Sequence, residues 1–590
     1  MVDRPIRIAN FSGALGDYTG ALADAVNGDP VDVVVGDYLA EMTMARIAAG
    51  FAGAEPGANS GLRQYYVPIF ARQLSPLLPE IAARGIKVVV NAGAFNPAGL
   101  ADSIRRECRE RGIALSVAHV VGDDVFDRVK QLAGEGQLRN LDTDAPLGDL
   151  ADRLVAANAY LGCWGIAAAL GAGADIVICG RVTDASLVMG PAAWWHDWQI
   201  DDWDALAGAL AAGHVIECGP QAQGGNFAGF TEIDAATRLG FPIAEIAADG
   251  SSVITKRVDE GGSVTVDTVT AQLVYEIQGT TYLNPDVTLH LETVRLEQVA
   301  ADRVQISGSK GSPPSPLTKV GCFYPNGWAT TLFGYATGTD VDAKIDWLRR
   351  QMQSIAGGLA LDDYHFDALG RPADNPSSQA EATVAIRIAA SAAKRSDVGR
   401  VIAGFTSFGL GGIPGFHGDV AGAPSPRTDY WPGLIRQADL AQQVVLDDGR
   451  ILEPPMPPVA AAVPGDTPDD VMPGVDASGE PATLGDLVYA RSGDKGANAS
   501  LGLWARTEEG WDFLQTRLGT AELASLLGLP EEVAVERYLL PNVRAALFIL
   551  KGYFGVSGSG NVGLDQVGKA LGEFARARTV LVAHAQRTAA

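Results

Sequence analysis

Two dense clusters of reactive side chains lie in the stretch 179–227, each directly after an apolar run. The first contains Arg181, Thr183 and Asp184. An arginine can hold a carboxylate or phosphate through two parallel hydrogen bonds, and a nearby carboxylate can orient the arginine or act as a base. The structural alternatives are an inert buried thiol at Cys179 and a helix cap at Thr183 and Asp184. We predict that this cluster belongs to a ligand-binding or catalytic face.

The second cluster places His214, Glu217 and Cys218 ahead of a glycine-rich loop. A strand is predicted for residues 214–218, which puts His214 and Glu217 on opposite faces, where either could act as acid or base. A Cys–His nucleophile pair and a metal site are the alternatives, although the spacing matches no standard zinc ligand set. The loop offers amide and backbone groups to a carbonyl, with a plain turn as its alternative; its residues are Gln221, Gly224, Gly225 and Asn226.

The elements that position these clusters are predicted from the first 190 residues, where short apolar runs alternate with helical patterns. Continuous Val and Ile runs predict strands that are buried on both faces, and the alternation predicts a mostly parallel, doubly wound α/β sheet. Ligands of such sheets bind beyond the carboxyl ends of the strands, so polar residues that follow the strands should converge. Those that we predict to bind substrate are Ser12, Gly13, Asp17, Asp37, Asn91, Gly93 and Thr183.

The turn 12–17 after the first predicted strand is rich in glycine. Its N–H groups and the helix that follows could bind a phosphate or carboxylate. The turn is neither a GxGxxG motif nor a P-loop. The alternative is a tight turn in which Asp17 caps the helix.

Beyond residue 240 the pattern predicts an α+β region. Strands are expected at 265–277, 287–292, 294–306, 380–389 and 401–408, with a helix near 340–356. The predicted units are a body of 1–452 (α/β over 1–240, α+β over 241–452), a proline-rich and acidic linker over 453–482, and a small α+β domain over 483–590. In that last domain the polar motif 492–498 is predicted to be a hairpin turn whose charge pair has a structural role.

The composition restricts the class of partner. With 47% apolar and 19% charged residues the chain is globular, and its 590 residues predict more than one domain. The net charge of 45 − 70 = −25 repels nucleic acid and anionic lipid, so we expect neither as a partner. Five cysteines without a CxxC pair, and the lack of a long apolar run, predict a cytoplasmic protein without a structural zinc or a membrane span.

Several motifs together resemble the acyclic terpene utilisation family (AtuA type). They are Asn10-Phe11-Ser12-Gly13, 36–43, Asn91-Ala92-Gly93, 179–186, Glu217-Cys218-Gly219 with Gly224-Gly225-Asn226, and 240–246. The resemblance covers about residues 5–450, and the segment 490–496 resembles the ferredoxin-fold domain that is often attached to the family. It implies a role in the catabolism of acyclic terpenes such as citronellol and geraniol, which proceeds through acyl-CoA intermediates. The chain has Gln223 where the family more usually has threonine.

These observations predict a catabolic enzyme that acts on a branched or carboxylated acyl-CoA by lyase or hydratase chemistry. Arg181 is expected to hold a carboxylate or phosphate, and Asp184, His214 or Glu217 to supply the acid or base. No cofactor is expected apart from the CoA of the substrate, and a homo-oligomer is expected. A non-catalytic binding or scaffolding subunit and a metal-dependent hydrolase are the alternatives.

Overall fold

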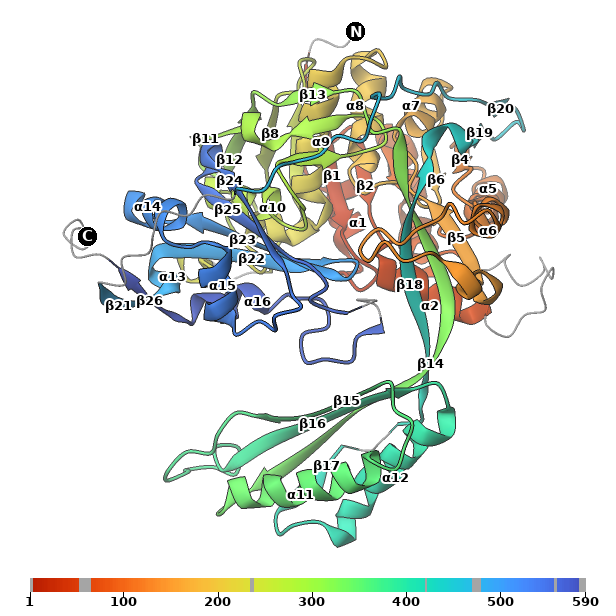
Figure 1. Cartoon of the computed structure of the whole chain (residues 1–590). Helices are drawn as coiled ribbons and strands as arrows, with labels where there is room; N and C mark the ends of the chain where they lie inside the picture. The colour runs from red at the N-terminus through yellow and green to blue at the C-terminus, as the bar shows by residue number, and fades with distance from the viewer. Residues whose placement is uncertain are drawn as a thin grey trace.

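The structure is a computed structural model that describes residues 4–51, 65–233, 238–419, 422–469, 479–555 and 560–582. Figure 1 shows a large body, a C-terminal domain packed against it, and a lobe that projects from the body. The mixed α/β class predicted from the sequence is confirmed. None of the helices in these ranges has the length and apolar character needed to span a lipid bilayer.

A long mixed sheet forms the centre of the body. Its strands in spatial order are β11 (Arg295–Ala300), β12 (Arg303–Ser307), β8 (Ser252–Thr255), β7 (Ile243–Ile246), β1 (Ile6–Ser12), β2 (Val33–Gly36), β3 (Lys87–Val90), β6 (Ile176–Cys179), β4 (Val117–Val121), β19 (Gln443–Val445) and β20 (Ile451–Leu452). The pairs that join β1, β2, β3, β6 and β4 are parallel, whereas the pairs on either side are antiparallel. The expectation of a mostly parallel sheet therefore describes these five strands, and strands from both sides of residue 240 share the sheet.

Helices cover both faces of the parallel strands. Alternate side chains of β1 enter different cores, with Ile6 and Ile8 in one and Ala9 and Phe11 in the other. The first core contains α7 (Trp164–Gly171), α8 (Ser186–His196) and α9 (Trp203–Glu217). The second contains α1 (Ala21–Asn27), α3 (Pro68–Leu74), α4 (Leu78–Arg84) and α5 (Pro97–Arg111). Burial on both faces explains why these strands are continuous Val and Ile runs.

Several predicted elements are wrong. The strand predicted at 214–218 is the end of α9, the strand at 265–277 contains α10 (Val266–Leu273), and the strand at 401–408 lies in α12 (Arg395–Gly411). A short apolar window does not separate a buried helix from a strand, and most of α9 is buried all round. For α10 the missed signal is a capping box between Thr265 and Thr268.

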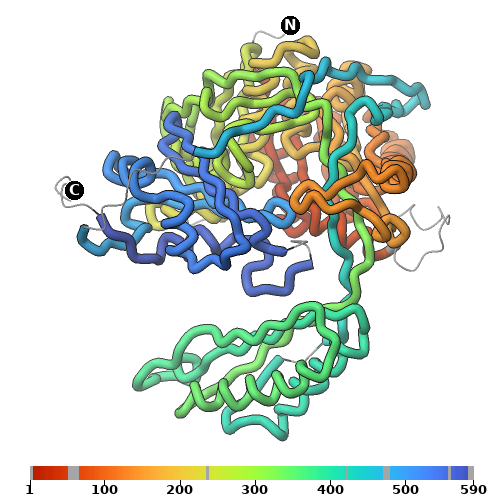
Figure 2. Tube along the Cα trace, viewed as in Figure 1, coloured from red at the N-terminus to blue at the C-terminus, as the bar shows by residue number. Residues whose placement is uncertain are grey.

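The projecting lobe is carried by two long antiparallel strands, β14 (Leu317–Thr337) and β18 (Ser425–Arg436). At the body end β14 also pairs with β5 (Ala156–Ala159). At the other end β14 joins β15 (Asp363–Leu369), β16 (Thr383–Ala392) and β17 (Phe416–Gly418), against which α11 (Val341–Ala356) and α12 pack in a separate apolar core. Figure 2 shows how the chain leaves the body on one strand and returns on the other.

The C-terminal domain is a sheet in the order β22 (Val488–Lys495), β23 (Asn498–Ala505), β25 (Ala545–Leu550) and β24 (Val535–Leu540). One face packs on its own helices α13 (Leu484–Leu487), α14 (Glu508–Thr516), α15 (Thr520–Leu527) and α16 (Leu571–Arg576). The other face, which includes Trp504 and Leu547, joins the core of the body. The sequence pattern also predicts a short helix near 530–537 in this domain, which is wrong, because β24 begins at Val535. Residues 470–478 of the predicted linker lie outside the described residues.

Candidate active site between the body and the C-terminal domain

Asp37 lies directly after β2, at the carboxyl edge of the parallel strands, and only 7% of it is exposed. Its Oδ1 accepts hydrogen bonds from Asn91 Nδ2 at 2.6 Å and from the N–H of Leu39 at 3.0 Å. Asn91 follows the neighbouring strand β3 and in turn accepts from the N–H of Tyr38. Burial, reinforced by the charge of Asp184, raises the pKa of Asp37 well above its ordinary value. Asp37 is therefore a candidate proton donor.

Arg181 follows β6 and is almost completely buried. Its Nη1 donates to the carbonyl of Leu39 at 2.7 Å and to Asp184 Oδ1 at 2.8 Å. The guanidinium also lies 4.2 Å from the centre of the Tyr160 ring. Only 4% of the Arg181 side chain is accessible, which leaves little of it to contact a ligand. Its hydrogen bonds instead orient Asp184 and the segment after β2.

A second cation, Lys319 of β14, lies on the same side of the body. Its Nζ is 3.0 Å from Glu41 Oε1, the first residue of α2 (Glu41–Ala48), and the Tyr160 hydroxyl donates to the same oxygen at 2.8 Å. Burial would raise the pKa of Glu41, but Lys319, Lys495 and Arg181 hold it well below its ordinary value. Glu41 is thus an ionised counter-charge for this cluster of cations.

His214 and Glu217 share one face of the last turn of α9, three residues apart. Their Nδ1 and Oε1 atoms are 3.1 Å apart, whereas the predicted strand would have separated them. Burial raises the pKa of Glu217. His214 Nε2 and Glu217 Oε2 are buried without a hydrogen-bond partner in the described residues. These two atoms are therefore available to a water molecule or a ligand.

Lys495 of the C-terminal domain completes the cluster. It is the last residue of β22, its Nζ is 3.6 Å from Glu276 Oε2, and 31% of its side chain is accessible. Its partial removal from bulk water lowers the pKa of Lys495, but Glu276 and Glu41 oppose this and raise it well above its ordinary value. The charge of Lys495 also acts on Glu217. We refer to this set, Asp37, Glu41, Arg181, Asp184, Glu217, Lys319 and Lys495, as the charged seam.

The hairpin that carries Lys495 is held firmly against the body. Asp142 accepts from the N–H of Ala497 at 2.9 Å and from Asn498 Nδ2 at 3.2 Å. Gly496 has a φ of +64°, which a residue with a side chain rarely adopts, and a Cβ there would also collide with Asp142. Beneath the hairpin, Trp504 Nε1 donates to Asp267 Oδ1 at 3.1 Å.

Arg491 forms the second link between the domains. It is 4% exposed, lies 4.2 Å from the centre of the Tyr275 ring, and donates to Gln221 Oε1. Gln272 also donates to that oxygen, at 3.4 Å. Gln221 was predicted to bind substrate, and its carbonyl oxygen instead holds the C-terminal domain.

Comparison with protein-family models identifies two matches. Residues 6–446 match the acyclic terpene utilisation family protein AtuA, and residues 482–580 match the AtuA ferredoxin-like domain. The chain belongs to the AtuA family. No curated protein and no solved structure matches it. The charged seam of this AtuA-family chain therefore combines residues of both matched regions, because Lys495 belongs to the ferredoxin-like domain and the other members belong to the AtuA match.

The remaining predicted residues at the edge of the sheet mostly support the fold. Asp17 accepts from the N–H groups of Gly13 at 2.6 Å and Ala14 at 3.0 Å, so it occupies donors that were expected to face an anion. Ser12 Oγ donates to the carbonyl of Asp37 at 2.8 Å. A Cβ on Gly13 would lie 2.5 Å from the carbonyl oxygen of Glu217. This close approach packs the end of β1 against the end of α9.

Other predicted ligand groups are also engaged. Thr183 Oγ1 accepts from Asn284 Nδ2 at 2.8 Å, and the N–H of Gly93 donates to the carbonyl of Cys179 at 3.0 Å. Gly224, Gly225 and Asn226 form a tight turn, in which the N–H of Gly225 donates to the carbonyl of Pro220 at 3.0 Å and Asn226 has a φ of +56°. The backbone geometry is that of a tight turn, and the binding of a carbonyl by this loop stays a prediction.

The two alternatives for the second cluster, a Cys–His nucleophile pair and a metal site, are addressed by the pKa values of the thiols and by the arrangement of possible metal ligands. Burial raises the pKa of Cys218 well above its ordinary value, as it does for the thiol of Cys179. A raised thiol pKa disfavours the thiolate that a nucleophile needs. Among the described residues no group of three or more His, Cys, Asp and Glu side chains is arranged to hold a metal ion.

Proposed function

We propose that the protein is a catabolic enzyme that acts on a branched or carboxylated acyl-CoA by lyase or hydratase chemistry at the charged seam. Its family implies a role in acyclic terpene utilisation. The observation that carries the finer proposal is the buried His214–Glu217 pair, whose Nε2 and Oε2 atoms lack a hydrogen-bond partner in the described residues and which lies within reach of the charge of Lys495. The pKa shifts of the neighbouring carboxyl groups support it. The pKa values of Asp37 and Glu217 are raised, whereas that of Glu41 is lowered. A carboxyl group whose pKa is raised towards the operating pH is suited to general acid–base catalysis, whereas the lowered pKa of Glu41 keeps that group ionised.

Both reaction types pass through a carbanion next to a carbonyl group, so they need a base, an acid and a cation. We assign the base to Glu217 with His214 beside it, the acid to Asp37, and the cation to Lys495. In a lyase step the base removes a hydroxyl proton, the C–C bond breaks, and its electron pair enters an enolate that the acid protonates on carbon. In dehydration the base removes the α-proton, the C–O bond breaks, and the acid protonates the departing hydroxide.

Lys495 and Lys319 are better placed than Arg181 to hold a substrate carboxylate or enolate oxygen. Their accessible side-chain fractions are 31% and 19%, against 4% for Arg181. Arg181 is then a positioning residue, since it is bonded to Asp184 and to the backbone beside Asp37. Such fixed charges stabilise a developing oxyanion without reorganisation during the reaction.

The test uses the purified full-length protein with a panel of branched acyl-CoA thioesters, some of which carry a second carboxylate. Mass spectrometry detects gain or loss of water, or cleavage into two products. Glu217→Gln and Arg181→Ala should abolish turnover without unfolding the protein, whereas Glu297→Gln on the exposed strand β11 should leave it unchanged. Full activity in both seam variants would remove this assignment.

A binding or scaffolding subunit is the second candidate, and the projecting lobe favours it. Trp347 is 52% exposed and Phe333 is 38% exposed on that lobe. Aromatic side chains are enriched among the residues that anchor protein–protein interfaces. If CoA and acyl-CoA raise the melting temperature but no thioester in the panel changes mass, the second candidate replaces the first.

A further inference from the structure

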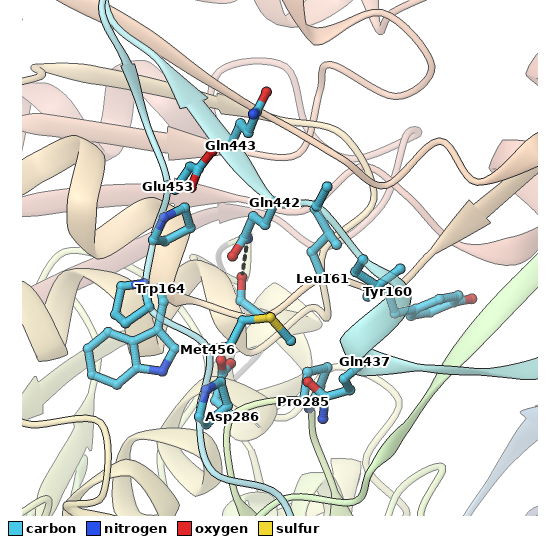
Figure 3. A pocket seen from close by; sticks show the side chains of 16 residues that line it. Tyr160, Leu161, Trp164, Pro285, Asp286, Gln437, Gln442, Gln443, Glu453 and Met456 are labelled. Atoms are coloured by element: carbon cyan, nitrogen blue, oxygen red, sulfur yellow. Dashed lines mark hydrogen bonds between the residues drawn. The ribbon is translucent and has the colours of Figure 1, made fainter. Parts of the chain in front are cut away.

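A cavity of about 300 Å³ lies on the other side of Tyr160 from the charged seam. Four segments that are distant in sequence line it, at 160–164, 285–286, 437–443 and 453–457. Figure 3 shows the side chains from these segments arranged around a common space, with Tyr160 at one end and its hydroxyl pointing away from the others. The volume falls at the lower end of the range for small-molecule sites.

The walls of this cavity are mainly apolar. Leu161, Trp164, Pro285, Leu440 and Met456 supply most of them. The remaining side is formed by the proline-rich segment 453–457, in which three of the five residues are proline. Proline has no backbone N–H, so this side offers few donors and is conformationally stiff. The sequence predicts only an extended linker for this segment.

The polar groups of the cavity restrict the ligand further. Trp164 is 7% exposed, and its Nε1 is buried without an acceptor in the described residues. Figure 3 draws this nitrogen on the side of the indole that faces Asp286 and Met456. Among the described residues that line the cavity, the charged ones are Asp286 and Glu453, and none is lysine, arginine or histidine. An anionic ligand is therefore disfavoured, while an oxygen that accepts from Trp164 is favoured.

Asp286 is itself occupied by the fold. Its Oδ2 accepts from the N–H of Cys163 at 2.7 Å. Burial raises the pKa of Asp286 to about 6. Asp286 is thus already hydrogen-bonded within the fold, whereas Trp164 Nε1 is a donor without a partner in the described residues.

We propose that this cavity binds an uncharged, mainly apolar molecule of on the order of ten heavy atoms that carries one hydrogen-bond acceptor for Trp164. The size follows from the volume at about 30 Å³ per heavy atom, the share of a molecule in liquid water. The proposal does not depend on the reaction at the charged seam. It assigns a second ligand site, for a neutral ketone, alcohol or ester with an aliphatic chain.

The cavity is joined to the charged seam through its backbone. The N–H of Leu161 donates to the carbonyl of Arg181 at 3.2 Å, and the N–H of Thr183 donates to the carbonyl of Leu161 at 2.9 Å. The Tyr160 ring that ends the cavity also lies under the guanidinium of Arg181. A ligand in the cavity would therefore pack against Tyr160 and Leu161, which contact Arg181 and Thr183.

The test is isothermal titration of the full-length protein with 2-octanone, and with octanoate as the charged probe of equal chain length. Saturable binding of 2-octanone, at least tenfold tighter than that of octanoate, is expected. Trp164→Phe keeps an aromatic ring but removes the donor, so it should weaken binding about tenfold, as expected for one hydrogen bond. No binding of 2-octanone, or equal binding of both probes, would overturn the proposal.

Met456→Trp tests the location, because Met456 lines the cavity and is 52% exposed, so the larger side chain is compatible with folding. It should abolish 2-octanone binding. Val459→Trp, three residues further along and 42% exposed, is the matched control and should bind as the parent does. Binding that survives Met456→Trp would place the ligand elsewhere. Lys495→Gln should also bind normally, which separates this site from failure of the proposed reaction.

Discussion

The charged seam and the apolar cavity lie on opposite sides of Tyr160, and their chemistry is opposite. The seam gathers three cations and several carboxyl groups, and one of its lysines comes from the C-terminal domain. None of the described residues that line the cavity has a basic side chain, and prolines form one of its sides. Tyr160 therefore separates a region in which ligand binding depends mainly on charge from one in which it depends mainly on the size and shape of the ligand.

This difference predicts how each region responds to substitution. Charges in a site with little water interact strongly, so loss of one cation changes the pKa of all its neighbours. An apolar cavity responds instead to changes in size, by clash or by lost contact. The comparison would be wrong if the seam responded to a change in side-chain size, or the cavity to a change in charge.

After the loss of turnover expected for Glu217→Gln and Arg181→Ala, Lys495→Gln should have the largest effect. It removes the accessible cation of the seam but keeps a side chain of similar length, so kcat for the active thioester should fall about 100- to 1000-fold, as for loss of one oxyanion donor. The measurement is steady-state turnover by mass spectrometry, with circular dichroism as the folding check. Lys310→Gln, whose side chain is 62% exposed, is the matched control. An equal loss of kcat in both variants would mean that Lys495 acts only through the net charge of the protein and not by contact with the substrate.

Asp37→Asn should reduce turnover and yet increase stability at pH 8. The pKa of Asp37 is raised in the folded state, so its contribution to stability is fully present below about pH 4 and is lost as the pH rises through the folded-state value. Asparagine keeps an acceptor for Asn91 and Leu39 but does not titrate. The melting temperature of the variant should exceed that of the parent increasingly from pH 5 to pH 8. A constant difference across this range would contradict the raised pKa of Asp37.

Much of the body can be predicted from sequence because its physical cause is local. Runs such as Val33–Gly36 are apolar throughout because helices cover both faces of the sheet. The convergence of Asp37, Asn91 and Arg181 then follows from the topology of parallel strands, since their carboxyl ends share one edge. No such rule predicts a contact made by a separate domain.

The parts that sequence reasoning missed depend on tertiary packing. His214 and Glu217 were assigned to a strand, because an apolar run within a buried helix lacks the usual amphipathic period. Lys495 lies in a polar motif that was predicted to be a structural hairpin turn. Its role depends on how β22 and β23 dock on the body, which Asp142 and Trp504 determine. The polar motif in an otherwise apolar sheet was the only local signal.

Met456→Trp should abolish the binding of 2-octanone, and it also tests whether the same cavity receives part of the substrate. If the cavity receives the far end of an acyl chain, KM for thioesters with long branched chains should rise about tenfold, because the indole occupies the volume that the chain would fill. The KM for short-chain thioesters and the kcat for both should stay unchanged. The measurement is a comparison of KM over a series of chain lengths, with Val459→Trp as the control. An unchanged KM at every chain length would show that the cavity is separate from the substrate path, whereas an equal rise at every chain length would show that the substitution disturbs the charged seam.

Trp504→Phe should have the smallest effect on chemistry and a measurable one on docking. The substitution keeps the aromatic packing with Phe227 but removes the hydrogen bond to Asp267, which costs about 1–3 kcal/mol when the acceptor stays partly buried. Trp347→Phe, on the exposed face of the lobe, should change stability by less than about 0.5 kcal/mol. Hydrogen exchange should report faster opening of residues 488–505 in Trp504→Phe alone. Because Lys495 reaches the charged seam only when this hairpin is docked, faster opening should lower kcat while the binding of 2-octanone in the cavity remains unchanged.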